Sequence, residues 1–595
     1  MFRPLISLVF FLSVLASMAA GETIEFTYDV NHEYYTTPFG TETAGRYDVA
    51  IRLADQSLVG KRVKSMSVPF KVRSSSYSDP VVWLSTRLAD SPDIVSVEAT
   101  VGGGAITAEF PEPVVIPEDG LYVGYSFGIH SLGTQAARLP IEVVGGMNPN
   151  GLFARMDPDL PDWMPLSEMY GVVSAMVVYI EGSFDSQGVG VDMGSYFVSP
   201  GQKATATATL FNHTTEPASS IAYTFTVGGS ATSATIPVAL PGSYGATASF
   251  SFPLPELPEG SYPYRLTVDS VNGMPNEAED GAVVGSYAVI NQTEKVRPLV
   301  EEYTGLWCQY CPSGYVAMEE MGEKYGDDFV GVAYHSGDQM QAPLSFPDNI
   351  TSFPSAVIDR RYLLSPSSLE SYWPDYQYKP SPASIDVNVE WADGGCELRA
   401  TSTTTFSVPL VNNRLRVAYI LVSDSLSDPS WYQINAYAGQ SGYSGKWWDI
   451  FTKGDGYLGG LVFNDVAILA GATFGERGSL PVQVEADESC THSYTFRLAD
   501  AVSAYDGKSL VHNPDWLRVV AVLLDPDSHE VFDCRSSAYP RATGGVGDLA
   551  SDAEVVETAY FDLHGRRIDM PAPGAVCICR RVMSDGRVLT SKIIR

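Results

Sequence analysis

The residues that could do chemistry stand in the segment Trp307-Cys308-Gln309-Tyr310-Cys311-Pro312. An apolar stretch, residues 296–303, precedes the two cysteines, and a helix-like run, residues 313–325, follows them. Two cysteines separated by two residues at such a strand-to-helix turn can place one thiol as an exposed nucleophile and the other as its resolving partner. The motif therefore predicts thiol–disulfide chemistry.

The start of a helix favours the thiolate form of Cys308. Unpaired backbone N–H groups and the helix dipole lower the pKa of a thiol placed there, relative to a thiol in a loop. We therefore expect Cys308 to be the nucleophile and Cys311 the resolving thiol. Two alternatives stay open, a structural disulfide and half of a zinc site. Zinc needs four ligands and the other close pair, Cys577 and Cys579, is remote in the chain, so no metal and no cofactor is predicted.

An α/β unit over residues 296–382 must position this motif. The strand before the cysteines, the amphipathic helix after them and the apolar run 329–334 predict a strand–helix–strand order. Residues 352–359 predict a proline that leads into another strand, and residues 366–373 a short helix. His335 follows the second strand and could touch the motif, although a structural role is more common for such a histidine.

The residues around the motif resemble the thioredoxin superfamily. Trp307 precedes the first cysteine, Glu302 stands six positions before Cys308, and Pro354 follows at the distance typical of that family's cis-proline. The resemblance implies that Glu302 assists proton transfer at the buried thiol. It also implies that the loop of Pro354 lies against the disulfide and the substrate backbone. With Cys308 and Cys311, these are the predicted catalytic residues.

A narrower resemblance is to the thioredoxin-like domain of the 28-kilodalton outer-membrane-protein family. It rests on residues 301–305, the Cys-x-x-Cys-Pro motif, Tyr334-His335 and Phe353-Pro354. It implies a cell-envelope protein whose partners are protein thiols or disulfides. Two features depart from the usual pattern. Gln309-Tyr310 between the cysteines leaves the redox direction open, and Phe353 is bulkier than the residue that usually precedes the proline.

The rest of the chain is predicted to be mainly β. Short runs of alternating apolar and polar residues, separated by Gly, Pro and Asn, predict a β-sandwich or jelly roll over residues 22–182 and an immunoglobulin-like domain over 188–291. The same pattern predicts a third β-sandwich domain over 383–540. The predicted fold class is thus a multidomain, mainly β protein whose β-sandwich and immunoglobulin-like modules flank one α/β domain that resembles thioredoxin.

A surface binding or adhesion protein is the competing interpretation. In it the thioredoxin-like domain is a scaffold, and the β modules bind a protein or glycan ligand. Several aromatic residues of the first module could line a sugar-stacking face, although aromatic residues are more common in the core: Trp83, Tyr122, Tyr125, Phe127 and Trp163. Two of Cys396, Cys490 and Cys534 could form a disulfide in the third β domain, and the sequence does not choose the pair. Whether the chain is an enzyme is therefore left open.

Charge and motifs exclude several classes of function. The 595 residues carry 37 basic and 70 acidic side chains, a formal net charge of −33, which argues against nucleic acid or an anionic membrane surface as partner. The His-Glu-x-x-His motif of zinc proteases and the P-loop motif of nucleotide-binding proteins are absent from the sequence. The thiol pair therefore remains the chemistry that the sequence states most directly.

The two ends of the chain carry targeting features. Residues 1–20 have the charged start, apolar core and small-residue end of a signal peptide, so we expect export. No later apolar run is long enough to cross a membrane. Residues 541–558 predict a linker, and residues 559–595 resemble the C-terminal sorting domain of type IX secretion. This resemblance implies a protein at the cell surface or outer membrane. An extracellular or periplasmic location stays open, and so does a small folding cap with no sorting role.

Overall fold

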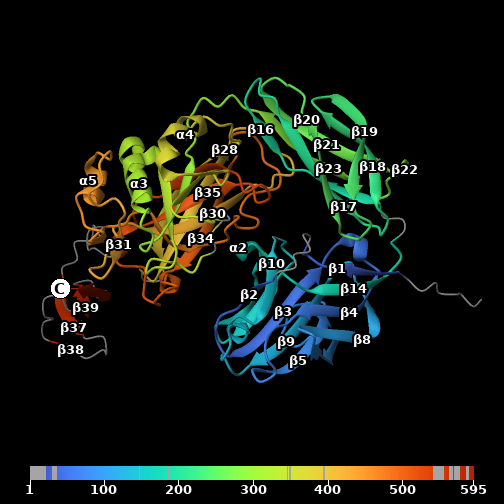
Figure 1. Cartoon of the computed structure of the whole chain (residues 1–595), viewed down its shortest axis with the longest axis horizontal. Helices are drawn as coiled ribbons and strands as arrows, with labels where there is room; N and C mark the ends of the chain where they lie inside the picture. The colour runs from blue at the N-terminus through green and yellow to red at the C-terminus, as the bar shows by residue number, and fades with distance from the viewer. Residues whose placement is uncertain are drawn as a thin grey trace, which may run out of the picture.

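The computed structural model describes residues 22–29, 36–146, 148–184, 188–344, 346, 350–392, 395–540, 555–561, 567–568, 576–583 and 588–594. The fold is multidomain and mainly β, as predicted. Figure 1 shows three large groups of sheets that follow one another along the chain, and a small sheet at the C-terminal end. Among these residues no helix has the length and apolar character needed to cross a membrane. The predicted signal peptide lies outside the described residues.

The first unit packs two main sheets over one core. A five-stranded sheet has the order β1-β14-β4-β8-β7, a six-stranded sheet the order β12-β11-β3-β9-β5-β6, and β13-β10-β2 form a smaller third sheet. The strands are β1 (Glu22–Phe26), β2 (Thr37–Phe39), β3 (Gly45–Leu53), β4 (Arg62–Pro69), β5 (Tyr77–Ser85), β6 (Val95–Glu98), β7 (Thr100–Gly102), β8 (Ala105–Val115), β9 (Leu121–Ile129), β10 (Ile141–Gly145), β11 (Phe153–Asp157), β12 (Leu160–Pro165), β13 (Val172–Ser174) and β14 (Val177–Gly182). Two short helices, α1 (Gln135–Arg138) and α2 (Ser167–Tyr170), lie in its connections.

The aromatic residues considered for sugar stacking divide between the two faces of the six-stranded sheet. Tyr125 and Phe127 are fully buried in the core. Trp83 and Trp163 meet edge to face, with 5.9 Å between ring centroids, and Arg155 lies over Trp163. Trp83 is only 6% exposed, so it offers almost no open ring face for stacking.

The second unit is an immunoglobulin-like sandwich. The sheet β15-β17-β20 packs against the sheet β16-β23-β21-β18-β19, with apolar residues of both in one core. The strands are β15 (Val189–Asp192), β16 (Tyr196–Val198), β17 (Thr205–Asn212), β18 (Ala218–Val227), β19 (Ser230–Leu240), β20 (Thr247–Pro253), β21 (Gly260–Val271), β22 (Met274–Pro275) and β23 (Ala282–Val289). Alternation of buried and exposed residues along β18 and β21 explains why the sequence pattern predicts it.

The third unit begins with the α/β order that the sequence predicts. Its elements are β24 (Leu299–Thr304), α3 (Pro312–Tyr325), β25 (Val330–His335), β26 (Ser355–Ile358), β27 (Tyr362–Leu364) and α4 (Leu369–Tyr376). β24 pairs in parallel with β25 and antiparallel with β26, and β27 pairs antiparallel with β26. Because α3 connects two parallel strands, its first turn lies at the carboxyl edge of the sheet. This edge carries the cysteines.

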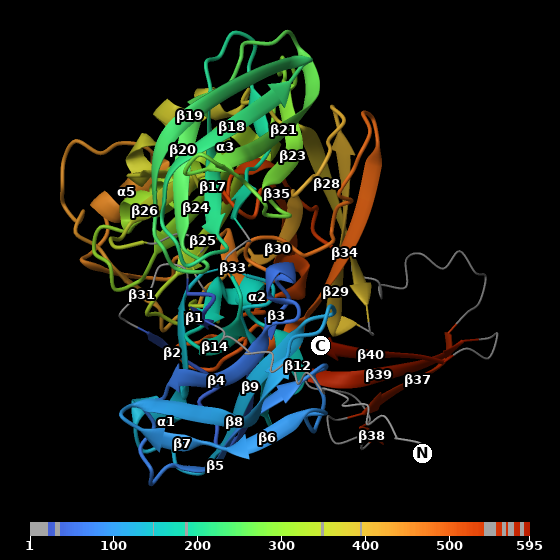
Figure 2. The same ribbon diagram turned by 90° about the vertical axis from the view of Figure 1, so that its right-hand side faces the viewer.

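The sheet of the α/β unit continues into the following β segment. Eight strands take the order β27-β26-β24-β25-β33-β30-β35-β36, and a separate sheet has the order β28-β29-β34. Figure 2 shows these last three strands side by side. The added elements are β28 (Ala383–Ala392), β29 (Glu397–Phe406), β30 (Arg416–Ser423), β31 (Tyr432–Ile434), α5 (Lys446–Thr452), β32 (Tyr457–Gly459), β33 (Val466–Ala470), β34 (Ser489–Arg497), β35 (Leu517–Leu524) and β36 (Val531–Ser536). The boundary predicted at residues 382 and 383 therefore separates segments that share one sheet.

The cysteines of the following β segment do not pair with one another. Cys396, Cys490 and Cys534 are free thiols, so the disulfide considered for two of them does not form.

The C-terminal strands β37 (Val555–Phe561), β38 (Arg567–Ile568), β39 (Val576–Met583) and β40 (Val588–Ile594) form a four-stranded sheet of order β38-β37-β39-β40. The first of these strands begins inside the predicted linker 541–558, whose residues 541–554 lie outside the described part.

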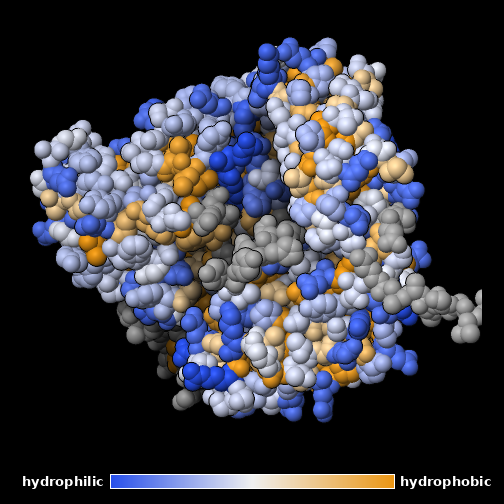
Figure 3. All heavy atoms as spheres, turned by 45° about the vertical axis from the view of Figure 1, so that its right-hand side comes forward, coloured by the Kyte–Doolittle hydropathy of each residue, from blue (hydrophilic) through white to orange (hydrophobic). Residues whose placement is uncertain are grey.

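The surface agrees with the acidic composition. Figure 3 shows a face that is mostly hydrophilic, with separate apolar patches. A net charge of −33 requires such a surface, since most ionised side chains stay in water.

Candidate functional site

Cys308 and Cys311 form a disulfide where β24 leads into α3. Their Cα atoms are 5.4 Å apart, and Cys311 directly precedes Pro312, the first residue of α3. Cys308 is 4% exposed and Cys311 1% exposed, whereas Trp307 and Tyr310 are about half exposed. Cys308, the candidate nucleophile, is therefore buried in the disulfide form, and its role as the nucleophile stays a prediction.

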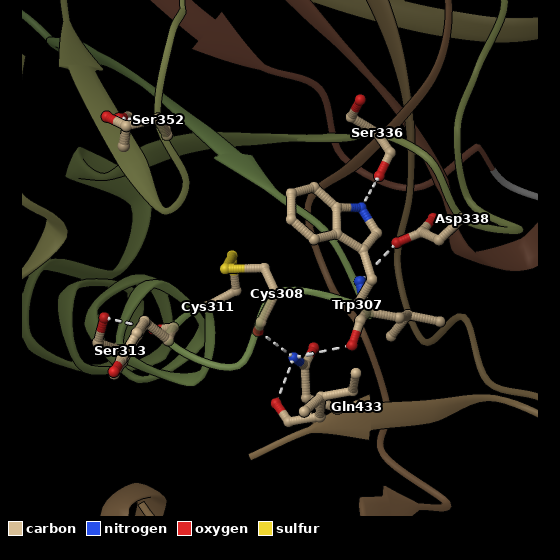
Figure 4. Close-up of a disulfide and its surroundings, with 12 residues drawn as sticks. Trp307, Cys308, Cys311, Ser313, Ser336, Asp338, Ser352 and Gln433 are labelled. Atoms are coloured by element: carbon tan, nitrogen blue, oxygen red, sulfur yellow. Dashed lines mark hydrogen bonds between the residues drawn. A yellow bond between two sulfur atoms is a disulfide. The ribbon is translucent and has the colours of Figure 1, made fainter. Parts of the chain in front are cut away.

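Trp307 and the cis-proline loop lie beside the disulfide. The indole Nε1 of Trp307 donates to the carbonyl of Ser336 at 2.6 Å, and its ring meets Phe353 with 5.6 Å between centroids. The peptide bond between Phe353 and Pro354 is cis. Figure 4 shows Trp307 next to the two cysteines, with the loop of Ser352 near the sulfur side. The bulky Phe353 thus contacts the tryptophan of the motif.

Glu302 is buried beneath the first turn of α3. A Cβ atom on Gly314 would overlap Oε1 of Glu302 and would lie 3.3 Å from Pro354. The carboxylate therefore touches the helix one turn after Cys311, and Oε1 accepts no hydrogen bond from any described residue. Burial raises the pKa of Glu302 to about 7, an effect that the charge of His335 and a hydrogen bond from Thr304 oppose.

His335 connects the end of β25 to the loop before the cysteines through Asp338. Its Nδ1 lies 2.8 Å from Oδ2 of Asp338, and the same oxygen accepts the backbone N–H of Leu306 at 2.8 Å. Burial pushes the pKa of Asp338 upward, but the charge and hydrogen bond of His335, with backbone N–H groups, hold the pKa below its usual value. The structural role expected for this histidine fits these contacts.

A segment of the following β region caps the cysteine loop. We call residues 431–463, which contain β31, α5 and β32, the capping segment. The side-chain amide of Gln433 donates to the carbonyl of Cys308 at 2.9 Å, and the backbone N–H groups of Ile434 and Ala436 donate to Leu306 and Gln309. Figure 4 shows Gln433 on the backbone side of the loop and the sulfur atoms on the opposite side.

The four predicted site residues come together, and the capping segment is the part that the sequence did not predict. Cys308, Cys311, Glu302 and Pro354 all lie around the first turns of α3. The sequence gives no sign that Gln433 belongs to the site, because a glutamine in a polar stretch is common. No group of three or more His, Cys, Asp or Glu side chains among the described residues is arranged to hold a metal ion.

Comparisons with known proteins give weak likenesses. No protein-family model and no curated protein matches the chain. Among solved structures, HBP35 of Porphyromonas gingivalis is 16% identical, with a TM-score of 0.31 over 51% of this chain and 99% of that one. A protein of Agrobacterium tumefaciens is 13% identical, with a TM-score of 0.24 over 41% and 96%. Likenesses at these TM-scores carry no inference about function.

Proposed function

We propose that the chain is an exported thiol–disulfide oxidoreductase of the cell envelope that acts on the thiols or disulfides of other proteins. The position of Glu302 carries the proposal. Its buried carboxylate lies one turn from Cys311, and its pKa of about 7 lets it take and release a proton near neutral pH. A purely structural disulfide has no need of such an acid.

The exchange uses the residues in fixed roles. The Cys308 thiolate attacks a substrate disulfide, a mixed disulfide forms, and the other substrate sulfur leaves as a thiolate. Cys311 then gives its proton to Glu302 and attacks the sulfur of Cys308. The bond to the substrate breaks, the substrate leaves as its second thiolate, and the Cys308–Cys311 disulfide remains. Oxidation of a substrate dithiol follows the same steps in reverse.

The rim of the site suits a polypeptide partner. Trp307 is 49% exposed and Tyr310 54% exposed, and both flank the disulfide. Exposed aromatic rings contribute large contact areas at protein interfaces.

Export and surface attachment are part of the same proposal. The signal-like residues 1–20 support export, and the sorting-like C-terminal module supports attachment to the cell surface.

A second candidate is a surface binding protein that keeps the pair as a structural disulfide. The burial of both cysteines and the capping by Gln433 favour it, because a catalytic disulfide must become accessible to its partner. The first module would then supply the ligand site.

Thiol exchange by the mature protein separates the two candidates. We expect the wild type to reduce insulin disulfides with dithiothreitol as electron donor, or to oxidise a dithiol peptide. Cys308→Ser should abolish this, and Cys311→Ala should accumulate the mixed disulfide. Cys396→Ser, which removes an exposed thiol elsewhere, should leave the rate unchanged. A wild type that exchanges no thiol in either direction would refute the oxidoreductase and favour the structural disulfide.

A further inference from the structure

A small cavity lies directly beneath the disulfide. Cys311, Glu302 and His335 line one part of it, and Asn464 and Asp465, from the turn before β33, line another. Its volume is about 20 Å3, which is room for a single water molecule. Glu302 lines this space, and its Oε1 accepts no hydrogen bond from the described residues. The walls are polar enough to hold a water there.

A larger cleft begins where the small cavity ends. It has a volume of about 630 Å3 and lies between α3 and residues of β35 and β36. Figure 1 shows α3 beside the sheet that contains β30 and β35. Glu319, Asn464 and Asp465 line both the cavity and the cleft, and Asn464 donates its amide to Glu319 at 2.7 Å. These three side chains, with Met318, which also lines both spaces, separate the buried acid from the open cleft.

Two of these wall residues are acids that keep a proton more readily than usual. Burial raises the pKa of Asp465 to about 7, the ion pair with Arg518 opposes the rise, and the nearby charge of Asp424 adds to it. Burial also raises the pKa of Glu319. The titratable and charged groups that face Glu302, Glu319 and Asp465 are Cys311, Tyr315, His335, Asp424, Lys446, Arg518 and Tyr539.

We propose that Asp465 and Glu319 form the exit through which the proton of Cys311 reaches solvent in the cleft. The inference rests on the proposed oxidoreductase function. Cys311 loses its proton to Glu302 as its sulfur bonds to Cys308 and the bond between Cys308 and the substrate breaks. Glu302 then passes the proton, through a water in the cavity, to Asp465 or Glu319. From there the proton goes to solvent water in the cleft. The opposite side of the loop is closed by Gln433.

The sheet fixes Asp465 relative to Glu302. Asp465 is held in place by its backbone, whose carbonyl accepts the N–H of Ala333 in β25 at 2.6 Å. Ala333 pairs with Glu302 in the parallel ladder of β24 and β25. The three residues are therefore fixed relative to one another by the sheet itself. Asp465 acts through Glu302 and is a positioning and relay residue.

The test compares Asp465→Asn with Asp327→Asn in the full mature protein. Both changes replace one carboxyl group in the lining of the cleft by an amide, but Asp327 does not line the cavity. We expect Asp465→Asn to slow repeated resolution of the mixed disulfide with a small aromatic disulfide probe, measured under turnover, by at least about tenfold at pH 7. The reason is that the proton left on Glu302 by each resolution leaves more slowly. The control should resolve it at the wild-type rate. Added imidazole should restore part of the lost rate, since it can carry the proton instead.

A second measurement is independent of turnover. The carboxyl band of Glu302, identified by its loss in Glu302→Gln, is titrated by infrared spectroscopy. We expect it to ionise at lower pH in Asp465→Asn and to stay unchanged in Asp327→Asn, because the charge of Asp465 holds a proton on Glu302.

The outcomes separate the exit from the proposed function. A wild type that resolves no mixed disulfide would refute the oxidoreductase. The exit alone would be overturned if the wild type is active and folded Asp465→Asn keeps both the wild-type rate of resolution and the wild-type titration of Glu302. If Asp465→Asn does not fold, because Arg518 loses one of its two carboxylate partners, Glu319→Gln takes its place with the same expected slowing. A wild-type rate there overturns the exit.

Discussion

Gln433 donates its side-chain amide to the backbone carbonyl of Cys308 across 2.9 Å, although the two residues are 125 positions apart in the chain. The same nitrogen lies 3.3 Å from the carbonyl of Leu306. A residue of the following β region therefore determines the shape of the loop that holds the disulfide. The cysteine motif and the capping segment therefore form one continuous structure.

Gln433→Ala should loosen the cysteine loop. The change removes a buried donor from the carbonyls of Leu306, Cys308 and Ile434. We expect the free energy of unfolding to fall by about 1–3 kcal/mol. We also expect faster reduction of the disulfide by dithiothreitol, because the loop can move away from its cover. Urea unfolding and a thiol-labelling time course measure the two effects.

Gln440→Ala is the matched control for this change. Gln440 belongs to the same capping segment, is exposed, and donates to Ala436 at 2.5 Å without touching the cysteine loop. Its removal should leave both the stability and the reduction rate close to those of the wild type. Equal reduction rates in Gln433→Ala and Gln440→Ala would show that the cap does not limit access to the disulfide.

Glu302→Gln should change how stability depends on pH. The pKa of Glu302 is about 7 in the folded protein against an ordinary value of 4.5. The stabilising effect of the protonated acid is therefore fully present below pH 4.5 and is lost as the pH rises through 7. Between about pH 5 and pH 8 the wild type should lose about 2.5 kcal/mol relative to Glu302→Gln. Urea unfolding of the oxidised proteins at both pH values measures the difference.

Glu294→Gln provides the control for the pH experiment. Glu294 is exposed, so the same chemical change is made there without removing a buried carboxyl group. Its stability should follow that of the wild type at both pH values. A Glu302→Gln protein that keeps the wild-type pH dependence would contradict the raised pKa and remove the main support for proton transfer by this residue.

Asp338→Ala should destabilise the end of β25. It leaves the buried His335 without its carboxylate and the N–H of Leu306 without an acceptor, so we expect a loss of about 3–5 kcal/mol at neutral pH. The pKa of Asp338 is lowered, so the contribution of the pair is present above the unfolded value of about 3.9 and is lost as the pH falls through the folded value. The deficit should therefore shrink in acid. Thermal unfolding across pH measures it, and exposed Asp375→Ala should show no such deficit.

Local spacing predicts the parts of the site that one stretch of chain contains. The strand, the cysteine pair and the helix are contiguous, so the pattern places Cys308 and Cys311 at a strand-to-helix turn. The place of Glu302 beside them is what the resemblance to thioredoxin implies, and Glu302 lies there. The proline at position 354 also falls where the resemblance places it, in a cis peptide bond against Gly314. These relations depend on backbone geometry that the residue types reveal.

Long-range pairing is the part that the sequence does not reveal. β25 and β33 meet in register at Ala333 and Val466, and this junction joins two segments that the periodicity treats as separate domains. Alternation along a strand shows which face is buried but not which strand lies beside it. The places of Gln433 and Asp465 follow from that pairing, so their contacts with the motif could not be predicted.

Gly314→Ala should disturb the contact between α3 and the buried acid. A Cβ atom at this position would overlap Oε1 of Glu302 and crowd Pro354. The helix must then move away from the sheet, or the acid must turn. We expect a loss of about 1–3 kcal/mol in the free energy of unfolding, although alanine favours helices intrinsically. Urea unfolding of the oxidised protein measures it.

Gly322→Ala, in the same helix, is expected to act in the opposite direction. The nearest atom to a Cβ at Gly322 is in Phe329, at 3.9 Å, so the methyl group fits without displacement. Alanine in place of glycine within a helix should then stabilise the protein by about 1 kcal/mol. Because both variants make the same chemical change in α3, their difference isolates the contact with Glu302. Equal stabilisation of both would show that the acid does not lie against the helix.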